Sequence, residues 1–186
     1  MSDRDLSQMD TDYLVEVLML SGSIANRERT TVLSELSKYY KTTLYTKETD
    51  RIGNLGNVIV RPPVNYEDEM YKVIFSGKIN LNLTMRAIET GVPQRVFDIM
   101  AVGGFVLSNY QEELEELFVP DKEIVLFRNL EELKQKAAYY LSHEKERIRI
   151  AIAGYQKVRE KYNYANSLSN MIALVENREE KRKNEK

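Results

Sequence analysis

The segment that decides the fold is KINLNLTMRAIETGVPQRVFDIMAVGGFVL, which spans residues 78–107. A short stretch that predicts a strand lies near each of its ends, the alternating Lys78–Asn82 and the apolar Phe105–Leu107. Between these runs, Gln94–Ala101 predicts a helix. A helix with short connections to a strand on either side predicts a right-handed crossover between parallel strands.

The same alternation of strands and helices continues on both sides of this segment. Short apolar runs predict further strands at Val15–Leu20, Thr42–Tyr45, Asn57–Val60 and Ile124–Phe127. Apolar residues at helical spacing predict helices from about Arg27 to Tyr40, from Tyr66 to Ile74 and from Gln111 to Phe118. Asn26 is the expected cap of the first helix.

These elements predict an α/β fold, a Rossmann-like open parallel sheet of about six strands with helices on both faces. The Val15–Leu20 strand is expected at its centre. A helical C-terminal extension follows, and Asn129 with Glu132 predicts a capped start for its first helix. We expect a flexible N-terminal segment at 1–12, one domain at 13–175 and a charged tail at 176–186.

Composition excludes several classes of protein. The chain has 186 residues, a formal net charge of -2, no cysteine and one histidine, His143. Without cysteine, disulfides and thiolate metal sites are impossible, and we expect no metal and no organic cofactor. The balanced charge disfavours generic nucleic-acid binding. An acidic N-terminus and the lack of a long apolar run predict a cytoplasmic protein with no membrane span.

Residues that follow the strands are the candidates for binding, because ligands of open α/β sheets lie at the carboxyl ends of the strands. The first candidate is the glycine turn with Ser21 and Gly22, for which a plain turn is the favoured alternative. The second is Arg61, in a stiff segment before two prolines that could equally be a simple linker. The third is Asn82. The sequence predicts Ser21, Arg61 and Asn82 at one edge of the sheet.

Two further candidate pairs lie in the deciding segment. Arg95 and Asp98 are three residues apart near the start of a helix, so one face could offer a phosphate clamp and a hydroxyl acceptor. They could also be a local surface ion pair. Gly103 and Gly104 could let the backbone approach a ligand closely, or they could simply end the preceding helix.

Residues Pro93–Leu107 resemble the nucleotide-sugar-binding half of GT-B glycosyltransferases, in particular the CgeB-like spore maturation group. The resemblance covers roughly Val15–Val175. It is strengthened by further stretches that occur in the same order as in that family, namely Lys78–Thr84, Asn109–Leu114, the Phe118 region and Tyr139–Tyr155. It implies a carboxy-terminal domain that binds a nucleoside diphosphate sugar. In such proteins the residue at the Asp98 position accepts hydrogen bonds from the ribose, and Arg95 would help to neutralise the diphosphate.

The sequence departs from the GT-B pattern in two ways. Thr90 stands where many retaining enzymes have a glutamate that touches the donor sugar. GT-B enzymes also have a first Rossmann-like domain, which carries the acceptor and any base, and this chain has one half of that arrangement. The resemblance therefore implies a donor-binding domain that is inactive alone and lacks an N-terminal acceptor domain.

Two other functions stay open on the sequence. One is a noncatalytic nucleotide-binding or protein-interaction module of Rossmann-like fold. The other is a receiver-type signalling domain, which is disfavoured because Ser21-Gly22-Ser23 lacks the necessary acidic cluster. The last helix has an apolar stripe, Leu168, Met171, Ile172 and Val175, that needs covering. We expect a monomer in which this helix folds back on its own domain, with a homodimer as the alternative.

Overall fold

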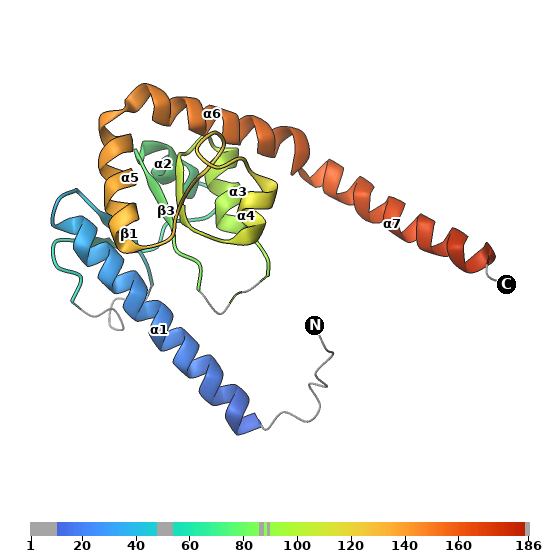
Figure 1. The fold of residues 1–186 in the computed structure, drawn as a ribbon, viewed down its shortest axis with the longest axis horizontal. Coiled ribbons are helices and arrows are strands. Elements are labelled where there is room, and N and C mark those ends of the chain that lie inside the picture. Colours follow the sequence, from blue (N-terminus) through green and yellow to red (C-terminus); the bar gives the residue numbers. More distant parts are fainter. Residues whose placement is uncertain (1–10, 48–53, 86–87, 89, 185–186) are drawn as a thin grey trace. The chain divides into compact units, whose positions relative to one another are not determined.

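A computed structural model describes residues 11–47, 54–85, 88 and 90–184 (Figure 1). Its helices and strands are, in chain order, α1 (Thr11–Ser37), β1 (Thr43–Tyr45), β2 (Ile59–Arg61), α2 (Met70–Ser76), β3 (Asn80–Asn82), α3 (Gln94–Ala101), β4 (Val106–Asn109), α4 (Glu112–Leu117), β5 (Val125–Phe127), α5 (Leu130–Ser142), α6 (Glu144–Lys161) and α7 (Tyr164–Asn184). The chain forms two compact units. Unit 1 comprises Met1–Tyr66 and Leu83–Gly91, and unit 2 comprises Glu67–Asn82 and Val92–Lys186.

Unit 2 contains a parallel sheet with the strand order β3-β4-β5. Asn80 pairs with Val106 and Asn82 with Ser108, and one residue further along β4 Asn109 pairs with Phe127. Helix α3 connects β3 to β4, as the deciding segment predicts, and helix α4 connects β4 to β5 (Figure 1). The predicted α/β class is confirmed, because parallel sheets are flanked by helices.

The core of unit 2 is formed where α3 packs beside the sheet. Val96, Ile99 and Met100 of α3 are buried in one cluster with Val106 of β4. Three aromatic rings extend this cluster, with centroid separations of 5.9 Å for Phe97–Phe118, 5.6 Å for Phe97–Tyr162 and 5.6 Å for Phe118–Tyr162. These contacts fix α3 against the carboxyl ends of α4 and α6.

The first predicted strand is wrong, because Val15–Leu20 lies inside α1, a helix of 27 residues. A short apolar run fits a buried helix segment as well as a strand, and periodicity alone does not separate them. One glycine within a helix costs only about 0.5–1 kcal/mol, so Ser21-Gly22-Ser23 does not end it. Asn26 is also within the helix, where its carbonyl accepts a hydrogen bond from Thr30 Oγ1 at 2.8 Å.

Unit 1 has a separate parallel sheet, formed by β1 and β2. The described residues therefore form sheets of two and three strands, and not the single sheet of about six strands that the sequence predicts. The loss of Val15–Leu20 as the central strand explains this difference. The predicted domain boundaries stay a prediction; residues 1–10 lie outside the described part, and α7 continues through the predicted tail to Asn184.

The start of the C-terminal helices is as predicted. Glu132 N donates to Asn129 Oδ1 at 2.9 Å, which caps α5. The fold-back of the last helix is contradicted, since Leu168, Met171 and Ile172 are 56–61% exposed. Within the described residues, no helix combines the length and the apolar character that crossing a membrane requires.

Candidate functional site

The candidate site lies at the carboxyl ends of the strands of unit 2. Asn82 ends β3, Asn109 ends β4, and Phe127 ends β5. Because α3, α4 and α5 each follow one of these parallel strands, their amino ends lie at the same edge of the sheet. The predicted site residues of unit 2 on these elements are Asn82, at the end of β3, and the pair Arg95 and Asp98, in α3.

Asn82 is locked to the neighbouring strand. Its side chain is 1% exposed, and its Nδ2 donates to Ser108 Oγ at 2.9 Å. The Ser108 hydroxyl is fully buried and in turn donates to the Asn109 carbonyl at 3.0 Å. Buried polar groups must be paired, so this chain of hydrogen bonds fixes the ends of β3 and β4 relative to each other. Asn82 therefore positions the edge of the site.

The first turn of α3 differs from those of the next two helices. It contains the exposed Arg95 and no acidic residue, and Pro93 at its N-cap makes no side-chain capping bond. The positive end of the helix dipole at such a start attracts an anion. Asp98 follows one turn later on the same face and is half-buried.

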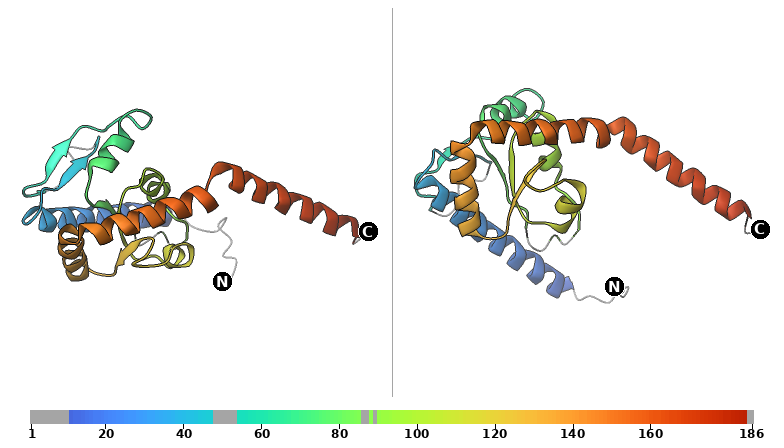
Figure 2. Two further views of the ribbon diagram at one scale, coloured as in Figure 1. Left: turned by 90° about the horizontal axis from the view of Figure 1, so that it is seen from above. Right: turned by 45° about the horizontal axis from the view of Figure 1, so that its top comes forward.

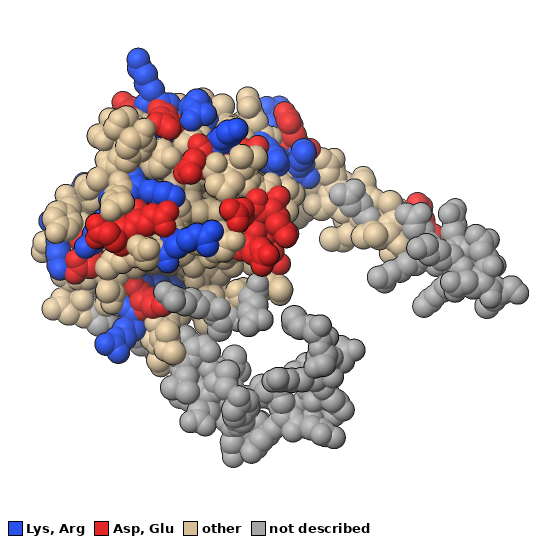
Figure 3. Space-filling model, in the orientation of Figure 1, with Lys and Arg blue, Asp and Glu red and all other residues tan. Residues whose placement is uncertain are grey.

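The first turns of α4 and α5 are acidic. Helix α4 begins with Glu112, Glu113 and Glu115, and α5 begins with Glu131 and Glu132. Figure 3 shows acidic side chains gathered over the position of α4. Carboxylates already balance the positive end of each helix and repel a further anion. Among these three helices, α3 is therefore the favourable place for a phosphate.

A Tyr–Arg stack lies at the ends of β4 and β5. The Arg128 guanidinium carbon is 3.6 Å from the centroid of the Tyr110 ring, and the Tyr110 hydroxyl donates to Glu115 Oε2 at 2.8 Å. This hydrogen bond to Glu115 is the main reason that the pKa of Tyr110 is raised. The sequence analysis missed the stack, because nothing in the spacing of the two residues shows that β4 and β5 pair in this register.

Gly103 and Gly104 lie at the amino end of β4, opposite the edge with Asn82. Gly103 has a φ of 75°, and its N–H donates to the Met100 carbonyl at 2.9 Å. The Gly104 N–H donates to the Ile99 carbonyl at 2.8 Å, which completes a Schellman motif. The geometry thus favours the second interpretation of Gly103 and Gly104, that they end helix α3. They lie away from the carboxyl ends of the strands, where a ligand would bind.

The remaining predicted site residues belong to unit 1. Ser21 and Gly22 lie within α1, so the predicted strand-to-helix turn with free amides does not exist. Arg61 is exposed at the end of β2, in a different sheet from Asn82. The prediction that Ser21, Arg61 and Asn82 share one sheet edge is wrong, since it depended on a Val15–Leu20 strand.

Glu132 makes the stability of the α5 start depend on pH. Its Oε2 accepts from Arg128 N at 2.8 Å, and its Oε1 lies 2.8 Å from Lys136 Nζ. The hydrogen bond from Lys136 lowers the pKa of Glu132. Because the pKa of Glu132 is lower in the folded chain than in the unfolded chain, its carboxylate stabilises the fold at pH values above its unfolded pKa, near 4.3. This stabilisation is lost as the pH falls through the folded-state pKa.

We expect Glu132→Gln to lower the free energy of unfolding at pH 7 by roughly 1 kcal/mol more than Glu131→Gln. Both variants remove one charge from the same helix turn, and Glu131 Oε1 accepts only a long, exposed hydrogen bond from Gln135 Nε2 at 3.4 Å, so their difference reports mainly the two contacts of Glu132. Urea denaturation from pH 7 to pH 3 measures this difference, which should shrink below about pH 4. A difference that stays constant over this range would contradict the interpretation.

Comparison with protein families agrees with this geometry. The family model described as "Glycosyl transferase-like" matches residues 23–173. The matched range includes β3, α3, β4 and the whole candidate site. No curated protein matches the chain. Because the match extends over most of the 186 residues, the chain belongs to the glycosyl transferase-like family.

Proposed function

We propose that unit 2 binds the sugar donor, a nucleoside diphosphate sugar, and that the chain is the donor-binding half of a GT-B glycosyltransferase of the CgeB-like group. Family membership supports glycosyl transfer in general. The observation that carries donor binding is the first turn of α3, which combines a cation with no acidic residue at the carboxyl edge of the sheet. The acceptor stays unspecified.

The proposed roles of the residues follow from their chemistry. The positive end of the α3 dipole and the Arg95 guanidinium bind the diphosphate. When the bond between the sugar and the diphosphate breaks, the electron pair leaves with the diphosphate, and both stabilise its growing negative charge. The Asp98 carboxylate accepts hydrogen bonds from the two ribose hydroxyls. Asn82 and Ser108 hold the strand ends under the donor.

The proposed arrangement assigns the acceptor to a separate N-terminal domain. The nucleophilic atom of the acceptor forms the new bond to the sugar and gives its proton to a base on that domain. Without it, the chain is expected to bind the donor but not to transfer the sugar, because orienting the acceptor supplies much of the rate.

We expect Arg95→Gln and Asp98→Asn each to weaken binding of the nucleoside diphosphate at least about tenfold, which corresponds to about 1.4 kcal/mol. A thermal-shift panel of UDP, GDP, CDP and their sugars identifies the ligand, and calorimetry on the variants then measures the affinity. The melting temperature of the free Arg95→Gln variant should change little, because Arg95 is exposed.

Two matched variants control for charge alone. Arg159→Gln removes an exposed cation from α6, and Asp68→Asn removes an exposed carboxylate from unit 2, so both should leave the affinity unchanged. The same samples should show no hydrolysis of the donor. If Arg95→Gln and Asp98→Asn bind as tightly as the parent chain, the α3 start is not the donor site.

A further inference from the structure

The donor proposed above has its nucleoside at one end, its diphosphate in the middle and its sugar at the other end. With the ribose at Asp98 and the diphosphate at the first turn of α3, the sugar continues along the carboxyl edge of the unit 2 sheet. Strand β4 is the middle strand of that sheet, and β5 lies next to it. The residues that follow these two strands are therefore the unit 2 groups available to the sugar; they are Tyr110 and Gln111 after β4 and Arg128 after β5.

Gln111 carries a buried acceptor that lacks a hydrogen bond. Its Oε1 is the one buried side-chain nitrogen or oxygen, among the residues that the structure describes, with no hydrogen-bond partner. Gln111 stands at the N-cap of α4, yet its side chain does not cap that helix. An unpaired buried acceptor costs free energy, which a hydroxyl donor of a ligand recovers. The residue as a whole is partly exposed, so a turn of its side-chain torsions brings the amide oxygen to the surface.

Arg128 brings hydrogen-bond donors to the same place. It is exposed, and no ion pair in the described part of the chain includes it. Its guanidinium carbon lies 3.6 Å from the centroid of the Tyr110 ring, and the hydrogen bond from the Tyr110 hydroxyl to Glu115 fixes that ring. A guanidinium has five N–H donors in its plane, so stacking on its face leaves donors at its edge for sugar hydroxyls.

Negative charge predominates at this part of the edge and favours an uncharged sugar. Carboxylates occupy the first turns of α4 and α5; they are those of Glu112, Glu113, Glu115, Glu131 and Glu132. Lys136 pairs with Glu132 and so balances one of them. A carboxylate on the sugar would be repelled here, whereas a sugar hydroxyl can donate to a carboxylate and accept from a guanidinium.

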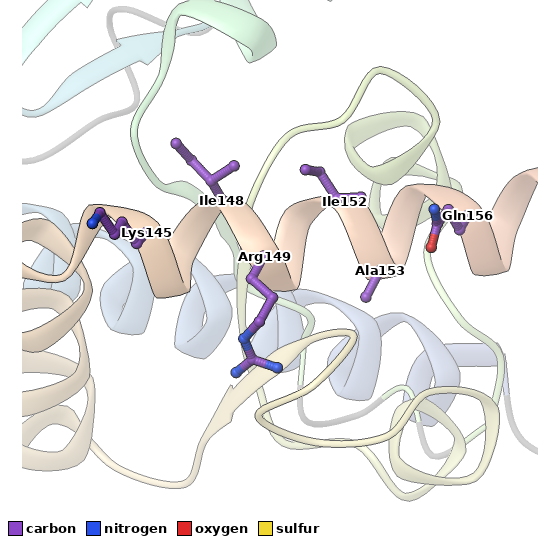
Figure 4. A pocket seen from close by; sticks show the side chains of 6 residues that line it. All are labelled: Lys145, Ile148, Arg149, Ile152, Ala153 and Gln156. Carbon is purple, nitrogen blue, oxygen red and sulfur yellow. The ribbon is translucent and has the colours of Figure 1, made fainter.

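A hollow on the surface of α6 is less suited to a sugar. It has a volume of about 420 Å³ and is lined by Lys145, Ile148, Arg149, Ile152, Ala153 and Gln156 (Figure 4). All six residues belong to one helix, so the hollow is an open face with no second wall. A bound sugar needs polar groups that converge on it from several sides, which the strand ends offer and this helix face does not.

We propose that Gln111 and Arg128 bind the sugar of the donor and select an uncharged sugar, and that Tyr110 is a positioning residue that holds Arg128. One sugar hydroxyl donates to Gln111 Oε1, and another accepts from the Arg128 guanidinium. Both contacts go to the sugar and neither goes to the diphosphate. They therefore raise the affinity for the sugar nucleotide above that for the nucleoside diphosphate. This assignment rests on the donor site proposed at α3.

Calorimetry on the whole chain compares ligands built on the base that the thermal-shift panel selects; for uridine these are UDP, UDP-glucose, UDP-N-acetylglucosamine and UDP-glucuronic acid. The tighter of the two uncharged sugar nucleotides should bind at least about fivefold more tightly than either UDP or UDP-glucuronic acid. Gln111→Met and Arg128→Gln should each remove most of this gain and leave the affinity for UDP unchanged. Methionine has a similar length but no amide oxygen, so Gln111→Met should also keep or raise the melting temperature of the free chain.

Matched variants separate sugar contacts from general effects. Gln156→Met and Arg159→Gln change exposed side chains of α6 and should alter no affinity. Tyr110→Phe keeps the ring under Arg128 and should retain the gain for the sugar nucleotide, whereas Tyr110→Leu should reduce it. A merely structural role of Tyr110 would lower the affinity for UDP as well.

The outcomes distinguish this inference from the proposed function. If the parent chain binds UDP and the sugar nucleotides equally, or if Gln111→Met and Arg128→Gln lower both affinities alike, the sugar assignment is overturned. The donor site at α3 then still stands, provided that Arg95→Gln weakens the binding of UDP. Tighter binding of UDP-glucuronic acid than of the uncharged sugar nucleotides would overturn the selection of an uncharged sugar. If no nucleotide binds, the proposed function and the sugar assignment both fall.

Discussion

Phe118→Ala is expected to lower the free energy of unfolding by about 3–5 kcal/mol. The Phe118 side chain is 1% exposed and packs on both Phe97 and Tyr162, so its loss leaves a cavity and removes two ring contacts. Because Phe97 belongs to α3, the same cavity loosens the helix that carries Arg95 and Asp98. Donor affinity should fall along with stability. Urea denaturation and calorimetry measure the two effects.

Phe75→Ala is the matched control for this variant. Phe75 lies on α2 of the same unit and is 74% exposed, so the same truncation should change stability by no more than about 0.5 kcal/mol. Equal losses for the two variants would mean that the aromatic cluster is not the core of unit 2.

Gly154→Ala is the second variant with a large expected effect. A Cβ at this position of α6 would lie 2.6 Å from the Glu123 carbonyl oxygen, a backbone atom that cannot rotate away. Forcing extra volume into such a contact costs about 1–3 kcal/mol or more, and we expect a loss of this size in thermal or urea unfolding.

The sign of the Gly154→Ala effect makes the test decisive. In an open helix, exchanging glycine for alanine stabilises by about 1 kcal/mol, because alanine has the better helix propensity. A stabilised variant would therefore show that α6 does not approach the turn before β5 as closely as the structure has it. A destabilised variant confirms the close approach, which lets α6 cover α3.

The elements that the sequence predicted well are those whose ends carry residues that start or stop helices. Helix α3 has the predicted bounds because Pro93 precedes it and Gly103 follows it with the positive φ of a helix end. The start of α5 was predictable because Asn129 and Glu132 have the spacing of a cap. Local chemistry decides these boundaries, so no tertiary information was needed.

The elements that the sequence predicted badly depend on distant parts of the chain. Val15–Leu20 is apolar enough for a strand or a helix, and only pairing with other strands could have decided between them. The partner of Asn82 is Ser108, a residue 26 positions away, and the stack of Tyr110 on Arg128 depends on the register of β4 with β5. These contacts depend on how the strands pair in the folded sheet, so the sequence alone does not predict them.

The strands at the margins of the unit 2 sheet are very short. Outer strands β3 and β5 have three residues each, and Asn80 at the start of β3 uses its side-chain Nδ2 to donate to the Ile74 carbonyl at 3.2 Å. Such margins offer few free backbone groups on which another chain could add a strand, and this protects against aggregation into extended sheets. Figure 2 shows from two further directions how short these strands are beside the long helices α6 and α7. We therefore expect that this protein does not form fibres through its unit 2 sheet at high concentration.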